Sequence, residues 1–166
     1  MSTLHGLPAH ILLNHFIIVL APLTAVLLIT CAVWPAARRR LVWPVLALAV
    51  VTLVLTPLTT SAGWWLQERV HQSPAVDTHT ALGNTMIYFS TMLLAAAVLL
   101  GLVHRYQERG RAVKPLVQLL ITVLVLAAAA AVTVQVYRIG VSGARAVWGG
   151  PLAFSAPRSN GIAGVA

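Results

Sequence analysis

Four long apolar stretches dominate the chain and restrict what it can fold into. They cover residues of about 9–33, 41–66, 79–104 and 115–138. A helix needs about 20 residues to cross a hydrocarbon core about 30 Å thick. Lipid offers the backbone no hydrogen-bond partners, so a spanning segment must be a helix or a strand of a closed barrel, and barrel strands have only about 10 residues. We therefore predict an all-α integral membrane protein built as a four-helix bundle.

The composition excludes an ordinary soluble domain. Of the 166 residues, 59% are hydrophobic and 8% are charged, whereas a soluble domain has about 25% charged residues. We expect one four-span transmembrane domain over residues 1–140 and a C-terminal tail over 141–166, with a short interfacial helix in "GVSGARAVWGG". The first apolar run is too long for a cleavable signal peptide, and no basic residue precedes it.

Basic residues gather in two of the three loops between the predicted spans. These loops hold seven of the eleven basic residues: Arg38, Arg39, Arg40, Arg105, Arg109, Arg111 and Lys114. By the positive-inside rule, both loops face the cytoplasm, which puts both termini on the outer, extracytoplasmic side. We expect the chain in the cytoplasmic membrane of a bacterium. Its net charge of +8 then orients it in the lipid bilayer, which we favour as its partner over nucleic acid.

Tryptophans mark the expected boundaries of the membrane. Trp34 and Trp43 flank the first basic loop, and Trp64, Trp65 and Trp148 fall at the opposite boundary. Tryptophan is enriched at membrane–water interfaces, where its ring is half in an apolar and half in a wet environment. We interpret these five residues as interfacial anchors.

Histidines concentrate at the predicted outer end of the bundle. A polar side chain inside the membrane is costly unless it is paired, so an intramembrane histidine is a candidate functional residue. His10 and His79 open two spans that run in the same direction, so we expect them at similar depth. His15 is five residues beyond His10, about 7.5 Å deeper and rotated by about 140°. The outer set is His5, His10, His15, His71 and His79, and only His104 lies near the inner end.

This distribution supports two interpretations. Imidazole nitrogen binds zinc, copper and haem iron, so histidines from two spans could hold one haem b or one copper or zinc ion near the outer face, in a redox role. Alternatively, each histidine hydrogen-bonds to a carbonyl or a polar neighbour. The candidate ligands are His10, His15 and His79, with Asn14, Asp77 and Asn84 as groups that orient the second ring nitrogen.

Other chemistry is poorly represented in the sequence. There is no HExxH pair, no CxxC pair and no phosphate-binding glycine loop, and the three carboxylates fall outside the predicted spans. We therefore favour a protein that is not an enzyme. A second hypothesis is an accessory subunit, packed against a larger membrane complex such as a respiratory one through the alanine run of span four and the tail. We expect Gln118 and Gln135 to hydrogen-bond between helices.

Four short motifs resemble those of a known family. They are "GLPAHILLNHF" at the first span, "TTSAGWW" at the end of the second, "DTHTALGNT" at the third and "YRIGVSGARAVWG" after the fourth. In this order they resemble the bacterial membrane family called domain of unknown function 2231. The resemblance implies four spans and histidines at the starts of spans one and three, which are His10, His15 and His79 here. The chain departs from the family pattern at Ile11, where relatives often have proline, and at Val141, where they have a polar residue or histidine, so no ligand is implied after span four.

Overall fold

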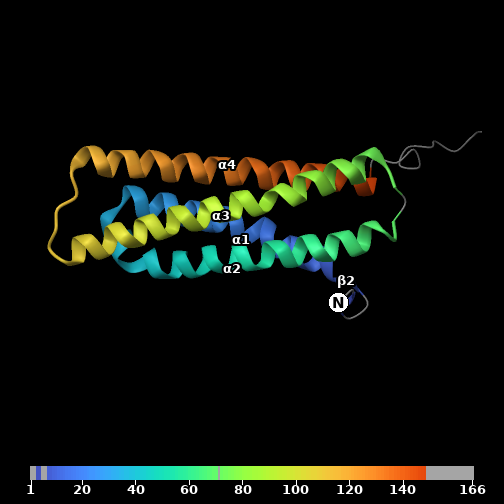
Figure 1. The fold of residues 1–166 in the computed structure, drawn as a ribbon, viewed down its shortest axis with the longest axis horizontal. Coiled ribbons are helices and arrows are strands. Elements are labelled where there is room, and N and C mark those ends of the chain that lie inside the picture. Colours follow the sequence, from blue (N-terminus) through green and yellow to red (C-terminus); the bar gives the residue numbers. More distant parts are fainter. Residues whose placement is uncertain (1–2, 5–6, 71, 149–166) are drawn as a thin grey trace, which may run out of the picture.

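Four long helices make up nearly all of the described structure. The computed structural model describes residues 3–4, 7–70 and 72–148. Its helices are α1 (Ala9–Val33), α2 (Pro35–Gln67), α3 (Pro74–Glu108) and α4 (Pro115–Trp148), preceded by the paired two-residue strands β1 (Thr3–Leu4) and β2 (Leu7–Pro8) (Figure 1). All four helices are long and apolar enough to cross a membrane. This confirms the predicted all-α fold of four helices, each long and apolar enough to span a membrane.

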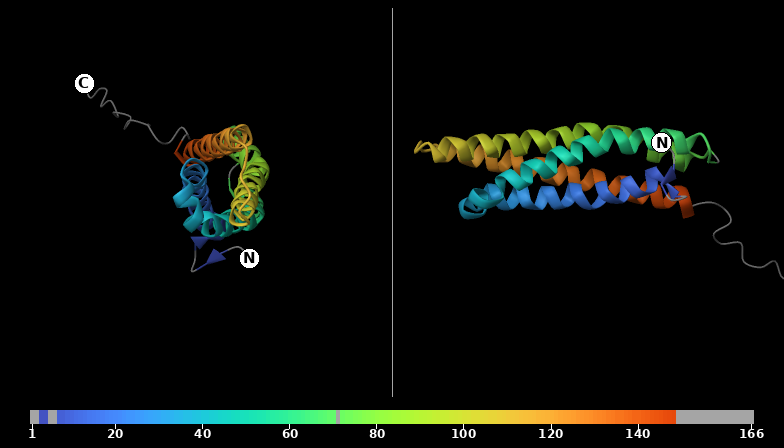
Figure 2. Two further views of the ribbon diagram at one scale, coloured as in Figure 1. Left: turned by 90° about the vertical axis from the view of Figure 1, so that its left-hand side faces the viewer. Right: turned by 90° about the horizontal axis from the view of Figure 1, so that it is seen from below.

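The helices form a square bundle in which each helix runs antiparallel to the next. Seen end-on, α1, α2, α3 and α4 follow one another around the square, so α1 and α3 face each other across a diagonal (Figure 2). The start of α1, the end of α2, the start of α3 and the end of α4 lie together, and we call this the histidine end. The opposite end, with the α1–α2 and α3–α4 connections, is the arginine end.

The helix boundaries follow local sequence signals. Three helices begin at a proline, which suits the first helical turn because its N–H groups have no partner in the helix. The hydroxyl of Ser73 also caps α3 by accepting a hydrogen bond from the backbone N–H of Val76 at 3.3 Å. The turn between α3 and α4 contains Gly110 at a φ of 72°, a left-handed conformation that favours glycine.

The end of α4 differs from the expectation. Instead of a separate interfacial helix, residues 139–148 continue α4 to Trp148. Neither Gly140 nor Gly143 adopts a positive φ, and no proline lies within this segment, so nothing there breaks the helix. The part of the predicted tail over residues 149–166 lies outside the described residues.

Small and branched apolar residues fill the interior. Leu28, Leu93, Leu100 and Val132 are almost completely buried where the four helices meet. The alanine run of α4 lies in two environments. Ala128 and Ala129 are buried, whereas Ala127 and Ala130 are exposed. Part of this run therefore packs inside the bundle.

Polar groups link the helices where the sequence suggested they would. The amide of Gln135 donates to the backbone oxygen of Leu82 at 3.0 Å and to the hydroxyl of Thr85 at 2.8 Å, which joins α4 to α3. At the arginine end, the amide oxygen of Gln118 accepts a hydrogen bond from the buried Arg38 at 3.4 Å. Both glutamines thus bond between helices, as expected.

The histidine at the arginine end is buried rather than interfacial. Only 4% of His104 is exposed. Its Nε2 lies 3.2 Å from a carboxylate oxygen of Glu108, one helical turn later. The ring of Trp43 meets it edge-on, at a centroid distance of 6.2 Å.

The tryptophans lie towards the two ends of the bundle. Trp34 precedes α2 and Trp43 follows within its first three turns, whereas Trp64, Trp65 and Trp148 are in the last turns of α2 and α4. Four of them are among the exposed large hydrophobic residues: Trp34, Trp43, Trp64 and Trp148. The role of the five tryptophans as interfacial anchors stays a prediction.

Candidate functional site

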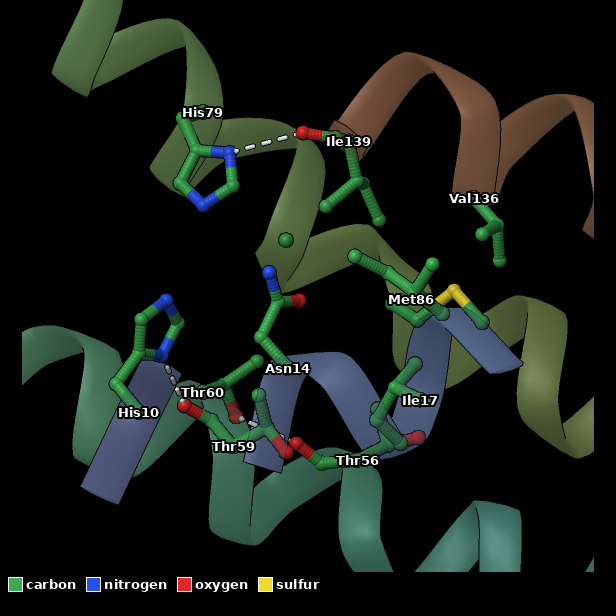
Figure 3. A pocket seen from close by; sticks show the side chains of 12 residues that line it. His10, Asn14, Ile17, Thr56, Thr59, Thr60, His79, Met86, Val136 and Ile139 are labelled. Atoms are coloured by element: carbon green, nitrogen blue, oxygen red, sulfur yellow. Dashed lines mark hydrogen bonds between the residues drawn. The ribbon is translucent and has the colours of Figure 1, made fainter. Parts of the chain in front are cut away.

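Two of the candidate histidines meet inside the histidine end. His10 is the second residue of α1 and His79 is the sixth residue of α3. Their ring centroids are 6.1 Å apart and their ring planes are nearly perpendicular, at 84° (Figure 3). Since α1 and α3 are diagonal neighbours, the two rings reach towards each other across the centre of the bundle.

His10 is held in place by α2. Its Nδ1 lies 2.9 Å from the backbone oxygen of Thr59. One turn later on α2, Gly63 packs directly against the ring, so that a Cβ atom at this glycine would lie 2.9 Å from both Nδ1 and Cε1 of His10. Only a residue without a side chain allows this approach.

His79 is held by α4 in the same way. Its Nδ1 lies 3.2 Å from the backbone oxygen of Ile139 and 3.1 Å from the hydroxyl of Ser142. Gly143, again four residues after the carbonyl, packs against the ring, and a Cβ atom there would lie 3.0 Å from Cε1. The two hairpins, α1–α2 and α3–α4, therefore present their histidines with equivalent supports.

The hydrogen bonds determine which nitrogen of each ring carries the proton. A carbonyl oxygen can only accept, so each Nδ1 must donate an N–H. The hydroxyl of Ser142 donates to the backbone oxygen of Ile139 at 2.9 Å, which leaves its oxygen to accept from the same Nδ1 of His79. In neutral rings both Nε2 atoms are then unprotonated. Figure 3 shows the second nitrogen of each ring on the side facing the other ring.

A small cavity lies beside the two rings. Its volume is about 40 Å³, and both histidines line it. Asn14 directs its amide towards the space beside the rings, whereas the thioether of Met86 lies away from them (Figure 3). Of the described residues that line the cavity, none is acidic.

The structure places the other candidate residues apart from this pair. His15 is exposed, and its Nδ1 bonds within α1 to the backbone oxygen of Ile11 at 2.6 Å. Asn84 is exposed and accepts a hydrogen bond from Trp64 at 3.1 Å, and Asp77 is exposed in the first turn of α3. Of the suggested orienting groups, only Asn14 lines the cavity. The side chains of His5 and His71 lie outside the described residues.

The groups that hold the rings do not stand out in the sequence. Gly63 lies within the motif "TTSAGWW", and Ser142 and Gly143 lie in the segment "GVSGARAVWGG", for which the sequence predicts a separate interfacial helix. The signal that could have found them is their spacing. In both α2 and α4 a glycine stands four residues after the residue whose carbonyl accepts the histidine N–H.

The comparisons with known proteins agree with this architecture. A family model described as "Predicted membrane protein (DUF2231)" matches residues 6–155, a range that includes both histidines and both glycines. No curated protein and no solved structure matches the chain. The matched range covers most of the 166 residues. The chain therefore belongs to the DUF2231 family of predicted membrane proteins.

Proposed function

We propose that this membrane protein binds one transition-metal ion between the imidazole rings of His10 and His79. The observation that carries the proposal is the pairing of two rings whose Nδ1 atoms are both engaged by backbone carbonyls. Each ring therefore offers the other only an Nε2 lone pair. Two acceptors that face each other need an electron-poor group between them, and a metal ion is such a group.

The distance between the rings supports direct ligation. A metal–imidazole bond is about 2.0 Å long, so two rings that bind one ion from opposite sides have centroids about 6 Å apart once the ring radii are included. The observed distance is 6.1 Å. The backbone carbonyls behind the rings act as the outer partners that commonly fix the tautomer and the orientation of a ligating histidine.

The space available favours a bare ion over haem. A cavity of about 40 Å³ accommodates one ion or a small number of water molecules. Sites for ligands nearer the size of a macrocycle have volumes of about 300–1,000 Å³. A haem between these rings would have to push the four helices apart, whereas an ion requires no such movement.

The charge distribution supports an outward-facing site. The arginine end carries seven of the eleven basic residues, and we infer that it faces the cytoplasm of a bacterial cell. The histidine end then faces the opposite side, where ions from the extracytoplasmic space reach it without crossing the bilayer.

Metal analysis of the protein purified in mild detergent tests the proposal. We expect one ion per chain in the wild type, and none in His10→Ala or His79→Ala, since either change removes half of the ligands. His15→Ala and His104→Ala are the matched controls, because each removes an imidazole outside the pair and should retain the ion.

Two outcomes would contradict the proposal. One is equal metal content in the wild type and in His79→Ala, with both proteins eluting as single species. The other is an intense Soret band in the absorption spectrum, which would show that the rings bind haem.

A further inference from the structure

We infer that the histidine pair selects monovalent copper, which it holds in linear two-coordination. This inference rests on the proposed function and specifies its ligand. Copper(I) has a filled d shell and is stable with two nitrogen ligands on opposite sides. Other ions that imidazole binds prefer a larger set of ligands, as zinc does with its four-coordinate tetrahedral sites.

The number of ligands is the first argument. Among the described residues, no three histidine, cysteine or acidic side chains are placed to share one ion. The hydroxyls of two threonines that line the cavity donate within their own helix, Thr59 to Leu55 at 2.8 Å and Thr60 to Pro57 at 3.1 Å, and the hydroxyl of Ser142 is at Nδ1 of His79 rather than at Nε2. Two imidazoles are thus the strong donors that the site offers.

The second argument is charge. A ring that keeps its Nδ1–H for the carbonyl and binds the ion through Nε2 is a neutral ligand, and the described lining of the cavity contains no carboxylate. The cost of placing an ion in a medium of low dielectric constant increases with the square of its charge. A divalent ion would therefore cost about four times as much as a monovalent ion, with no anion to offset it.

The third argument is the orientation of the rings. Because they approach from helices on opposite corners of the bundle, their nitrogens lie on opposite sides of any ion between them (Figures 2 and 3). The ring planes cross at 84°, which keeps the ring hydrogens of one imidazole away from those of the other. This arrangement matches linear coordination and leaves a tetrahedral ion two ligands short.

The geometry also argues against cycling of electrons at the site. Copper(II) requires about four ligands in a tetragonal arrangement, so oxidation of the bound ion would demand two more donors from the cavity wall. The site therefore stabilises the reduced ion. Its expected role is to hold copper(I) at the membrane rather than to transfer electrons.

Competition for copper(I) tests the inference. The full chain in detergent is titrated under anaerobic conditions with copper(I) against a chromophoric chelator, and separately with Zn²⁺. We expect copper(I) to bind at least about 1,000-fold more tightly than Zn²⁺. The X-ray absorption spectrum of the copper-loaded protein should show two nitrogen neighbours and the near-edge feature of two-coordinate copper(I).

The outcomes distinguish a failure of this inference from a failure of the proposed function. If Zn²⁺ binds as tightly as copper(I), or if the copper has three or four neighbours, the linear copper(I) site is wrong while an ion site at the pair remains. If neither ion binds, and a folded His79→Ala gives the same titrations as the wild type, both ideas are wrong. Circular dichroism and gel filtration of each variant show whether it is folded.

Discussion

Histidines lie inside both ends of this bundle, with His104 buried and with His10 and His79 half-buried, and the two ends surround them differently. At the arginine end, His104 has a carboxylate four residues later, since its Nε2 lies 3.2 Å from Glu108. At the histidine end, the positions four residues after His10 and His79 are Asn14 and Gly83, neither of which is acidic. The first imidazole is satisfied within its own helix. The rings of His10 and His79 have backbone partners at Nδ1, and no carboxylate stands one turn later to pair with Nε2. This difference distinguishes a structural histidine from a candidate ligand.

Among changes that keep both histidines, the largest expected effect comes from filling the space behind a ring. Gly143→Ala and Gly63→Ala each place a methyl group about 3 Å from an imidazole. The ring must then shift from its position opposite the other histidine. We expect the affinity for the ion to fall by about 10- to 100-fold, measured by competition titration, while the bundle stays folded.

Gly140→Ala is the matched control for Gly143→Ala. It lies in the same helix, and a Cβ atom there meets no other group within 4 Å. If both alanine variants of α4 left the affinity unchanged, the support of the ring by Gly143 would have no role in binding.

The second test gives the histidine end the carboxylate that it lacks. Asn14→Asp changes the side chain very little in size but adds a negative charge and a hard oxygen donor beside the rings. We expect Zn²⁺ to bind roughly tenfold more tightly than in the wild type, which reduces the preference for copper(I). Asn84→Asp, which adds the same charge outside the cavity, should leave the ratio of the two affinities unchanged.

The third test removes the carboxylate from the arginine end. Glu108→Ala leaves Nε2 of the buried His104 without its partner, which should lower the free energy of unfolding by about 1 kcal/mol. Thermal unfolding in detergent measures this, and metal content should not change. Glu68→Ala is the control, because that carboxylate pairs with the exposed Arg69 at 3.6 Å and should contribute little.

The smallest expected effect concerns a residue that the sequence suggested as an orienting group. Asn84→Ala removes the hydrogen bond from Trp64 on the surface between α2 and α3. We expect a loss of stability of about 0.5 kcal/mol and no change in ion affinity. A fall in ion affinity as large as that expected for Gly143→Ala would show that Asn84 contributes to the site.

The four helices could be predicted because length and hydropathy alone identify a spanning segment. The similar depth of His10 and His79 could also be predicted, since it follows from the antiparallel order of the spans. The orientation of each helix about its own axis could not. Helices that are apolar on all sides do not indicate which face is buried. His15 therefore looked equivalent to His10 in the sequence, although it lies on the outside of α1.

The supports of the rings are hidden from sequence analysis for a related reason. The groups that fix each tautomer are backbone oxygens, which every residue has, so neither Thr59 nor Ile139 is distinguished by its side chain. The expected role as an accessory subunit stays a prediction, because it concerns surfaces and partners beyond this one chain.

Each hairpin supplies one histidine of the proposed site together with all the groups that hold it, and this has a mechanical consequence. In both hairpins one helix supplies the ring and its partner supplies the carbonyl and the glycine. An ion shared by His10 and His79 would therefore act as a removable cross-link between two units that are otherwise held together by apolar packing and by hydrogen bonds such as that from Arg38 to Gln118. Binding would oppose the separation of the hairpins, and the resistance of the bundle to opening would rise and fall with the supply of the ion.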